Sequence, residues 1–289
     1  MSYKEELKKL TIKDNFMFGA VMLEEENCRR FLELVLEIPI AHVEVIREKS
    51  IVYHPEYKGI RLDVYAKDEK NSRYNIEMQV LPGEGLEKRT RYYHSQIDME
   101  LLLQGESYAG LPDSYVIFIC DFDPFGKGKY RYTFQNKCGE ERELCMNDGC
   151  KSIFLSTQGN NAEEVPVSLV KFLNFVKADL EESTADFEDE FVKKLQKSIC
   201  RIKQTREMEE RYMILWEMLR DERAEGRAEG KAEGMAEAVM SVLEEYGTVP
   251  EVLQQQILSI KDADLLKKYL RTAIHTDSVE QFAETIQKL

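Results

Sequence analysis

Residues 60–80 read IRLDVYAKDEKNSRYNIEMQV, and this stretch decides how the rest of the chain is interpreted. Apolar residues alternate with other residues over 60–66 and again over 74–80, which is the period of a β-strand. The polar segment 68–72 between them is typical of a turn. The stretch therefore predicts an antiparallel hairpin.

This hairpin brings two acidic residues together. If Lys67 lies opposite Arg73, the same register places Asp63 opposite Glu77. Side chains that lie directly opposite have Cβ atoms about 4.5–5.5 Å apart. Because side chains alternate along a strand, Gln79 shares their face, while the apolar residues point to the other face and a core. We expect the polar face to border a cleft.

Two carboxylates at this separation repel each other unless a shared proton or a divalent cation offsets their charge. Mg²⁺ takes oxygen ligands and needs only one or two protein carboxylates together with substrate phosphates. The same pattern also fits solvated polar residues on the open face of a sheet. A one-residue slip in register would separate the two acids, so the spacing alone leaves both interpretations open.

The rest of the chain shows a mixed pattern of helices and strands. The first forty residues have helical periodicity, and a second helical segment follows the hairpin. The continuous apolar run within residues 114–122 is typical of a buried strand. From about residue 165 onward the pattern is helical. The expected elements are a helix over 85–107, strands over 114–122, 129–134, 142–146 and 153–156, and one long helix over 187–219.

Residues 223–238 repeat a four-residue unit, RAEGRAEGKAEGMAEA. Acidic and basic residues alternate, which suits a solvated helix. The glycines weaken such a helix by about 1 kcal/mol each relative to alanine. We interpret this segment as a marginal helix that connects two bodies.

Composition excludes several classes of protein. The chain has 289 residues and six cysteines, none in a CxxC pair, which argues against a zinc ribbon and a disulfide framework and fits a reducing cytoplasm. It lacks an apolar run long enough to span a membrane. The net charge of −14 opposes nonspecific binding to nucleic acid, except where basic residues gather locally, as over 127–137.

Several segments together resemble a known family. The resemblance covers residues 3–177 and resides in DNFMFG (14–19), RLDVYA (61–66), NIEMQ (75–79), RYYHSQ (91–96), GESY (105–108) and YVIFICDFDP (115–124). These segments are similar to the Rpn family of recombination-promoting nucleases, also described as transposases, within the PD-(D/E)XK nuclease superfamily. The charged tail with RAEG-like repeats is also similar to that family.

The resemblance implies an α/β fold with a restriction-endonuclease-like core, in which a mixed sheet is flanked by helices. We expect this nuclease domain over residues 1–180. An all-helical region is expected over 181–289, with the RAEG-repeat connector at about 221–238. The implied activity is divalent-metal-dependent DNA endonuclease action, linked to recombination, mobile elements or defence.

The resemblance also assigns site residues. Asp63 and Glu77 are implied as ligands of Mg²⁺, or of Mn²⁺ or Ca²⁺, and Gln79 takes the usual position of a lysine. Asp14 is a possible additional acid, and one of the glutamates at 24–26 is the alternative. A Gln79→Lys replacement is expected to preserve or raise cleavage.

The expected partner is double-stranded DNA, and no membrane association is expected. The residues that we expect to contact DNA are Arg91, Gln96, Lys127, Lys129 and Arg131. Apolar residues near Trp216 predict a homo-oligomer formed through the helical tail. The alternative is a catalytically silent DNA-binding or oligomerising protein on the same fold. Gln79 and the acidic charge both motivate this alternative.

Overall fold

The computed structural model describes residues 2–51 and 60–287, which divide into two units after Tyr212. The first unit contains a β-sheet with helices on both faces. The second unit is built from helices. Among the described residues, no helix combines the length and the apolar character needed to cross a bilayer.

The described part of the sheet has six strands in the order β1-β2-β3-β4-β6-β5. Strands β3, β4 and β6 run parallel to one another, and the remaining neighbours are antiparallel. This mixed sheet confirms the expected fold class. The strands are β1 (Val43–Ile51), β2 (Ile60–Asp68), β3 (Arg73–Gln79), β4 (Ser114–Cys120), β5 (Arg131–Phe134) and β6 (Cys150–Ser156).

The hairpin of β2 and β3 has the predicted register. Lys67 pairs with Arg73 and Val64 pairs with Ile76. Asp68 holds the turn, because its Oδ1 accepts hydrogen bonds from the backbone N–H groups within the turn, including that of Ser72 at 2.8 Å. Such short-range bonds are the reason that aspartate favours turns. The turn therefore fixes which residues of the two strands lie opposite each other.

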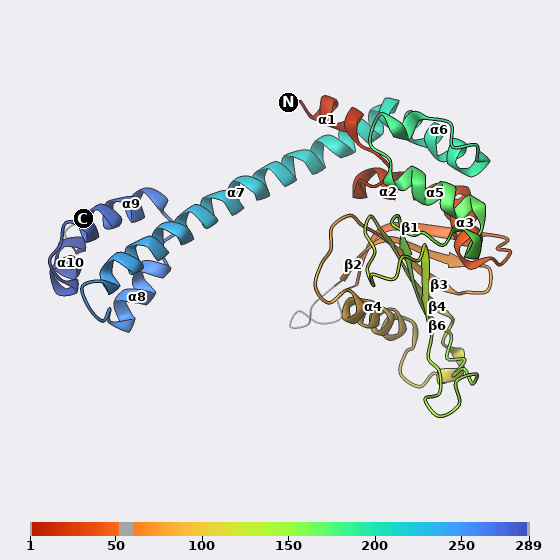
Figure 1. Ribbon diagram of the computed structural model, residues 1–289, viewed down its shortest axis with the longest axis horizontal. Coiled ribbons are helices and arrows are strands. Elements are labelled where there is room, and N and C mark those ends of the chain that lie inside the picture. The colour runs from red at the N-terminus through yellow and green to blue at the C-terminus, as the bar shows by residue number, and fades with distance from the viewer. Residues whose placement is uncertain (1, 52–59, 288–289) are drawn as a thin grey trace. The chain divides into compact units, whose positions relative to one another are not determined.

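Helices cover both faces of the sheet. Figure 1 shows α4 on one side and α2, α3 and α5 on the other. The helices of this unit are α1 (Tyr3–Lys9), α2 (Asn15–Met22), α3 (Glu25–Leu36), α4 (Leu86–Leu101), α5 (Val167–Lys177) and α6 (Glu190–Gln204), with 3₁₀ turns at Tyr108–Gly110, Ala162–Glu164 and Glu182–Thr184.

Helix α6 is part of the first unit. It contacts α2, α3 and α5, and it buries Phe191, Val192, Leu195 and Ile202. The boundary expected at residue 180 therefore lies inside this unit. That residues 1–180 form a domain by themselves stays a prediction.

Two expected elements differ in the structure. Residues 142–146 form no strand, and only a single bridge joins Lys137 to Cys145. Their apolar side chains, Leu144 and Met146, are exposed, so no core stabilises a strand there. Instead β5 pairs with β6. The single helix expected over 187–219 is two helices, because the chain is extended at Thr205 between α6 and α7.

The second unit has its own core. The C-terminal half of α7 packs its buried face, including Val239 and Leu243, against the helices that follow it, through residues such as Leu266 and Phe282. The repeat over 223–238 is continuous helix within α7. The helices are α7 (Arg206–Glu244), which begins in the first unit, α8 (Glu251–Leu258), α9 (Ala263–Ile274) and α10 (Val279–Ile286).

A buried histidine fastens α4 to the sheet. The side chain of His94 is 8% exposed, and its Nδ1 and Nε2 lie 2.7 Å from Ser114 Oγ and 3.1 Å from Ser152 Oγ. Burial lowers the pKa of His94 to about 4, although the charge of Asp148 acts in the opposite direction. The neutral imidazole therefore bridges β4 and β6.

This burial predicts a pH dependence of stability. Below pH 6.5 the unfolded chain protonates His94 while the folded chain does not, so stability falls as the pH falls toward 4. Between pH 7 and pH 5 the loss due to His94 is about 2 kcal/mol. Urea unfolding at both pH values should show a smaller difference for His94→Gln than for the natural chain. His42→Gln, at an exposed position, is the control, and equal differences in all three proteins would contradict the prediction.

Candidate active site

The two acidic residues of the hairpin lie together in the structure. Asp63 on β2 donates its backbone N–H to Oε1 of Glu77 on β3 at 3.3 Å, and Asn75 Nδ2 donates to the same oxygen at 3.2 Å. The side chain of Glu77 is 6% exposed, and Asp63 is half-buried. The hairpin thus presents both carboxyl groups on one face of the sheet.

Burial and the nearby charge of Asp63 raise the pKa of Glu77 to about 8. The charged form of Glu77 is therefore disfavoured at neutral pH, and either a proton or a bound cation would offset its charge. The amide Oδ1 of Asn75 is buried beside them without a hydrogen-bond partner. Two carboxyl groups and an amide oxygen are hard oxygen donors, so these residues fit a divalent cation such as Mg²⁺ or Mn²⁺.

The helix expected after the hairpin is α4, and it covers this face of the sheet. Tyr93 and Ile97 of α4 pack with Phe118 of β4 in one apolar cluster. Burial and the charge of Glu77 raise the pKa of Tyr93 to about 12, so its hydroxyl stays protonated near the acid pair. The expectation of a cleft is wrong for Glu77, because the aromatic face of α4 packs on this part of the sheet and buries the Glu77 side chain.

Gln79 is held from two sides. Arg89 of α4 donates from Nη2 to Gln79 Oε1 at 2.6 Å, and Gln79 Nε2 donates to the carbonyl of Leu81 at 2.7 Å. From the sequence, Arg89 is one of a small basic cluster on the helix after the hairpin, without an assigned role in the site. Its spacing of four from Tyr93 and eight from Ile97 places it on the buried face of α4, and this period was the signal that could have found it.

The structure does not bring a third acid to the pair. Asp14 accepts hydrogen bonds from the backbone and hydroxyl of Thr11 at the start of α2. Glu24 accepts from Ser198, and Glu26 pairs with Arg29. Within residues 2–51 and 60–287, no three Asp, Glu, His or Cys residues converge in a way that could hold a metal.

The residues expected to contact DNA differ in their surroundings. Arg91 and Lys127 are exposed, whereas Lys129 pairs with Glu164 at 2.7 Å. Arg131 pairs with a glutamate of the loop after α3 at 2.6 Å. Gln96 is buried, so its amide does not reach the surface where a DNA backbone would lie.

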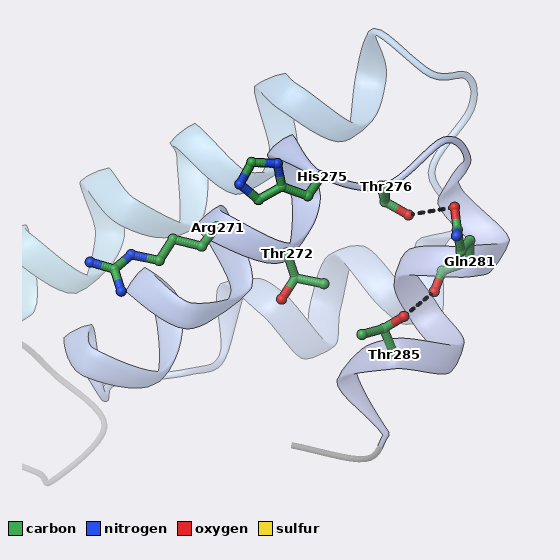
Figure 2. A pocket seen from close by; sticks show the side chains of 6 residues that line it. All are labelled: Arg271, Thr272, His275, Thr276, Gln281 and Thr285. Atoms are coloured by element: carbon green, nitrogen blue, oxygen red, sulfur yellow. Dashed lines mark hydrogen bonds between the residues drawn. The ribbon is translucent and has the colours of Figure 1, made fainter.

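The second unit carries a polar pocket of about 340 Å³. Figure 2 shows Thr276 and Thr285 both hydrogen-bonded to Gln281. The pocket contains no carboxylate, so its chemistry does not favour a divalent cation. Its lining residues are Arg271, Thr272, His275, Thr276, Gln281 and Thr285.

Comparison with models of known protein families shows to which family the chain belongs. A family model for PD-(D/E)XK nuclease family transposases matches residues 13–228. The chain belongs to this family. The match includes the acid pair, Gln79 and Arg89, and it continues past residue 180 into α7, as the first unit does. No curated protein and no solved structure matches the chain.

The raised pKa of Glu77 predicts proton-coupled binding of metal. Below pH 8 Glu77 carries a proton that a cation must displace, so affinity should fall about tenfold per pH unit from pH 8 to pH 6. Calorimetric titration with Mn²⁺ at pH 7, in two buffers of different ionisation heat, should show release of about one proton. Glu77→Gln should abolish this release, and Glu87→Gln, at an exposed position on α4, should not. Affinity that is independent of pH would contradict the prediction.

Proposed function

We propose that this protein is a divalent-metal-dependent DNA endonuclease that hydrolyses phosphodiester bonds. The observation that carries the proposal is the Asp63–Glu77 pair, in which a buried carboxyl group with a raised pKa faces a second carboxyl group. Membership of a nuclease and transposase family supports the same conclusion. Recombination, mobile-element transfer or defence against foreign DNA in the cytoplasm is the proposed setting.

The residues have distinct proposed roles. Asp63 and Glu77 would hold Mg²⁺ or Mn²⁺, with Asn75 Oδ1 close to Glu77. A bound divalent ion supplies a water of lowered pKa and offsets charge on a phosphate. Gln79 uses one lone pair of Oε1 and one hydrogen of Nε2 in its internal bonds. The second lone pair and the second hydrogen remain for orienting a water.

Double-stranded DNA is the proposed substrate. Arg91 and Lys127 are exposed and can contact phosphates directly. Lys129 and Arg131 are held in ion pairs with surface carboxylates. The Lys129 pair is solvent-exposed and contributes little to stability, so a phosphate can replace its carboxylate. Arg131 is half-buried and also donates to the carbonyl of Val35 at 3.0 Å, so it is held more firmly.

A catalytically silent DNA-binding or interaction protein is the second candidate. Two features favour it: position 79 holds a neutral glutamine in place of the usual lysine, and Glu77 is buried beneath α4, which limits the access of water to it. The two candidates differ in whether bound DNA is cut when metal is present.

Cleavage of supercoiled plasmid separates the candidates. With Mg²⁺ or Mn²⁺ the natural chain should nick plasmid, and Asp63→Asn or Glu77→Gln should slow nicking at least about 100-fold, because each removes a carboxylate ligand. The exposed Glu87→Gln is the matched control and should retain activity. DNA binding without cleavage at every metal concentration would favour the silent protein.

We also propose that the tail joins a second copy of the chain. On α7, Ile214 is 56% and Met218 is 58% exposed, and four residues separate them on the same side of the helix. Apolar side chains that face solvent in this way are typical of association surfaces. Such pairing would provide two active sites for cutting two strands.

A charge on this apolar stripe should disrupt the association. Replacing Ile214 and Met218 together by lysine is expected to convert the oligomer to a monomer, because a lysine would have to be desolvated in the interface. Light scattering coupled to size exclusion measures the mass. Val252→Lys, at an exposed apolar position on α8, should leave the mass unchanged. A natural chain that is already a monomer would refute self-association.

A further inference from the structure

Arg89 is a half-buried cation that forms no ion pair with an aspartate or glutamate in the described part of the chain. Its Nε is buried without a hydrogen-bond partner. Its side chain donates a hydrogen bond to a neutral amide, that of Gln79. A charge taken out of water is costly unless something else stabilises it, so its surroundings matter.

Two aromatic rings hold the guanidinium in place. Cζ of Arg89 lies 4.9 Å from the ring centroid of Phe118 and 5.8 Å from that of Tyr93. Cations are attracted to such ring faces. Phe118 lies beside Glu77 in the parallel register of β4 and β3. The guanidinium is therefore fixed over the strand pair that carries Glu77, and its charge lowers the pKa of Glu77 against the effect of burial.

Arg89 also determines which way the amide of Gln79 points. A guanidinium only donates hydrogen bonds, so the atom of Gln79 that faces Arg89 must be the carbonyl oxygen. The amide nitrogen then faces the carbonyl of Leu81, an acceptor, and both bonds agree. A planar amide that is held at both ends has one orientation.

We propose that Arg89 supplies the positive charge of this site and acts with Gln79 as one unit, in which position 79 must stay neutral because the cation comes from α4. The proposal rests on the nuclease function proposed above. Arg89 is a positioning residue here, because it acts through Gln79 and through its charge near the acid pair.

The proposal changes one expectation from the sequence. Gln79→Lys was expected to preserve or raise cleavage. In the structure a lysine at this position would bring its ammonium group toward the guanidinium of Arg89 and would remove the acceptor that Arg89 uses. Like charges at this separation repel each other, and Lys offers no acceptor. We now expect Gln79→Lys to impair the site unless Arg89 is removed as well.

A double-mutant cycle tests this pairing. The proteins are the natural full-length chain, Gln79→Lys, Arg89→Gln and the double variant, with cleavage rate, KM and thermal unfolding measured for each. Each single variant should cleave at least tenfold more slowly, equivalent to about 1.4 kcal/mol of transition-state stabilisation. The double variant should cleave at least tenfold faster than Gln79→Lys, because the site then again holds one cation instead of two. Lys88→Gln removes a charge at the next, exposed position and should neither slow cleavage nor rescue Gln79→Lys.

Two results would overturn the proposal. One is a Gln79→Lys variant that cleaves as fast as the natural chain. The other is a double variant that regains thermal stability but cleaves no faster than Gln79→Lys, which would make the pair purely structural. If the natural chain cuts no DNA, the proposed nuclease function is wrong. The coupling between positions 79 and 89 is then tested by comparing the unfolding temperatures of the four proteins. A double variant more stable than Gln79→Lys would support the coupling, and additive losses would overturn it.

Discussion

The properties of the candidate site depend on one constraint, the position of the Glu77 side chain beneath helix α4. Glu77 lies on β3, inside the sheet, where Asp63 faces it and α4 covers it. A buried carboxylate beside a second one is unfavourable, so the site calls for a proton or a cation. The amide of Asn75, the hydroxyl of Tyr93 and the charge of Arg89 lie near the carboxyl group of Glu77. The pKa of Glu77 nevertheless stays raised. Within the described residues, Glu77 is therefore an acid whose charged form is disfavoured by burial and by a neighbouring carboxyl group.

The hairpin and its acid pair could be predicted from the sequence because the information is local. Alternation of apolar residues gives the faces of two strands, and a turn held by Asp68 sets their register. The cover of α4 over Glu77 could not be predicted in this way. It depends on packing between Tyr93 and Phe118, which are separated in the sequence by the end of α4 and the loop that leads to β4. The helical period places Arg89 on the buried face of α4, but its pairing with Gln79 could not be predicted, since Gln79 lies on another element.

The two differences between the expected and the observed secondary structure also arise from contacts between distant elements. The strand expected over 142–146 has a suitable local pattern, but β5 obtains its partner from β6, and the segment is left with exposed apolar side chains. Tertiary pairing thus overrides local preference. The break at Thr205 inside the expected long helix allows α6 to pack on α2, α3 and α5 before α7 begins. The continuous helical repeat of α7 shows that three glycines do not suffice to interrupt it.

The stacking of Phe118 beneath α4 has a wider consequence. The ring contacts the guanidinium of Arg89, whose charge lowers the pKa of Glu77, and it packs beside Tyr93, whose own pKa is raised by Glu77. A hydrocarbon side chain with no ionisable atom thereby helps to set the proton affinity of an acid on the neighbouring strand. Core packing around Phe118 and the acid–base behaviour of Glu77 are therefore coupled through the position of Arg89.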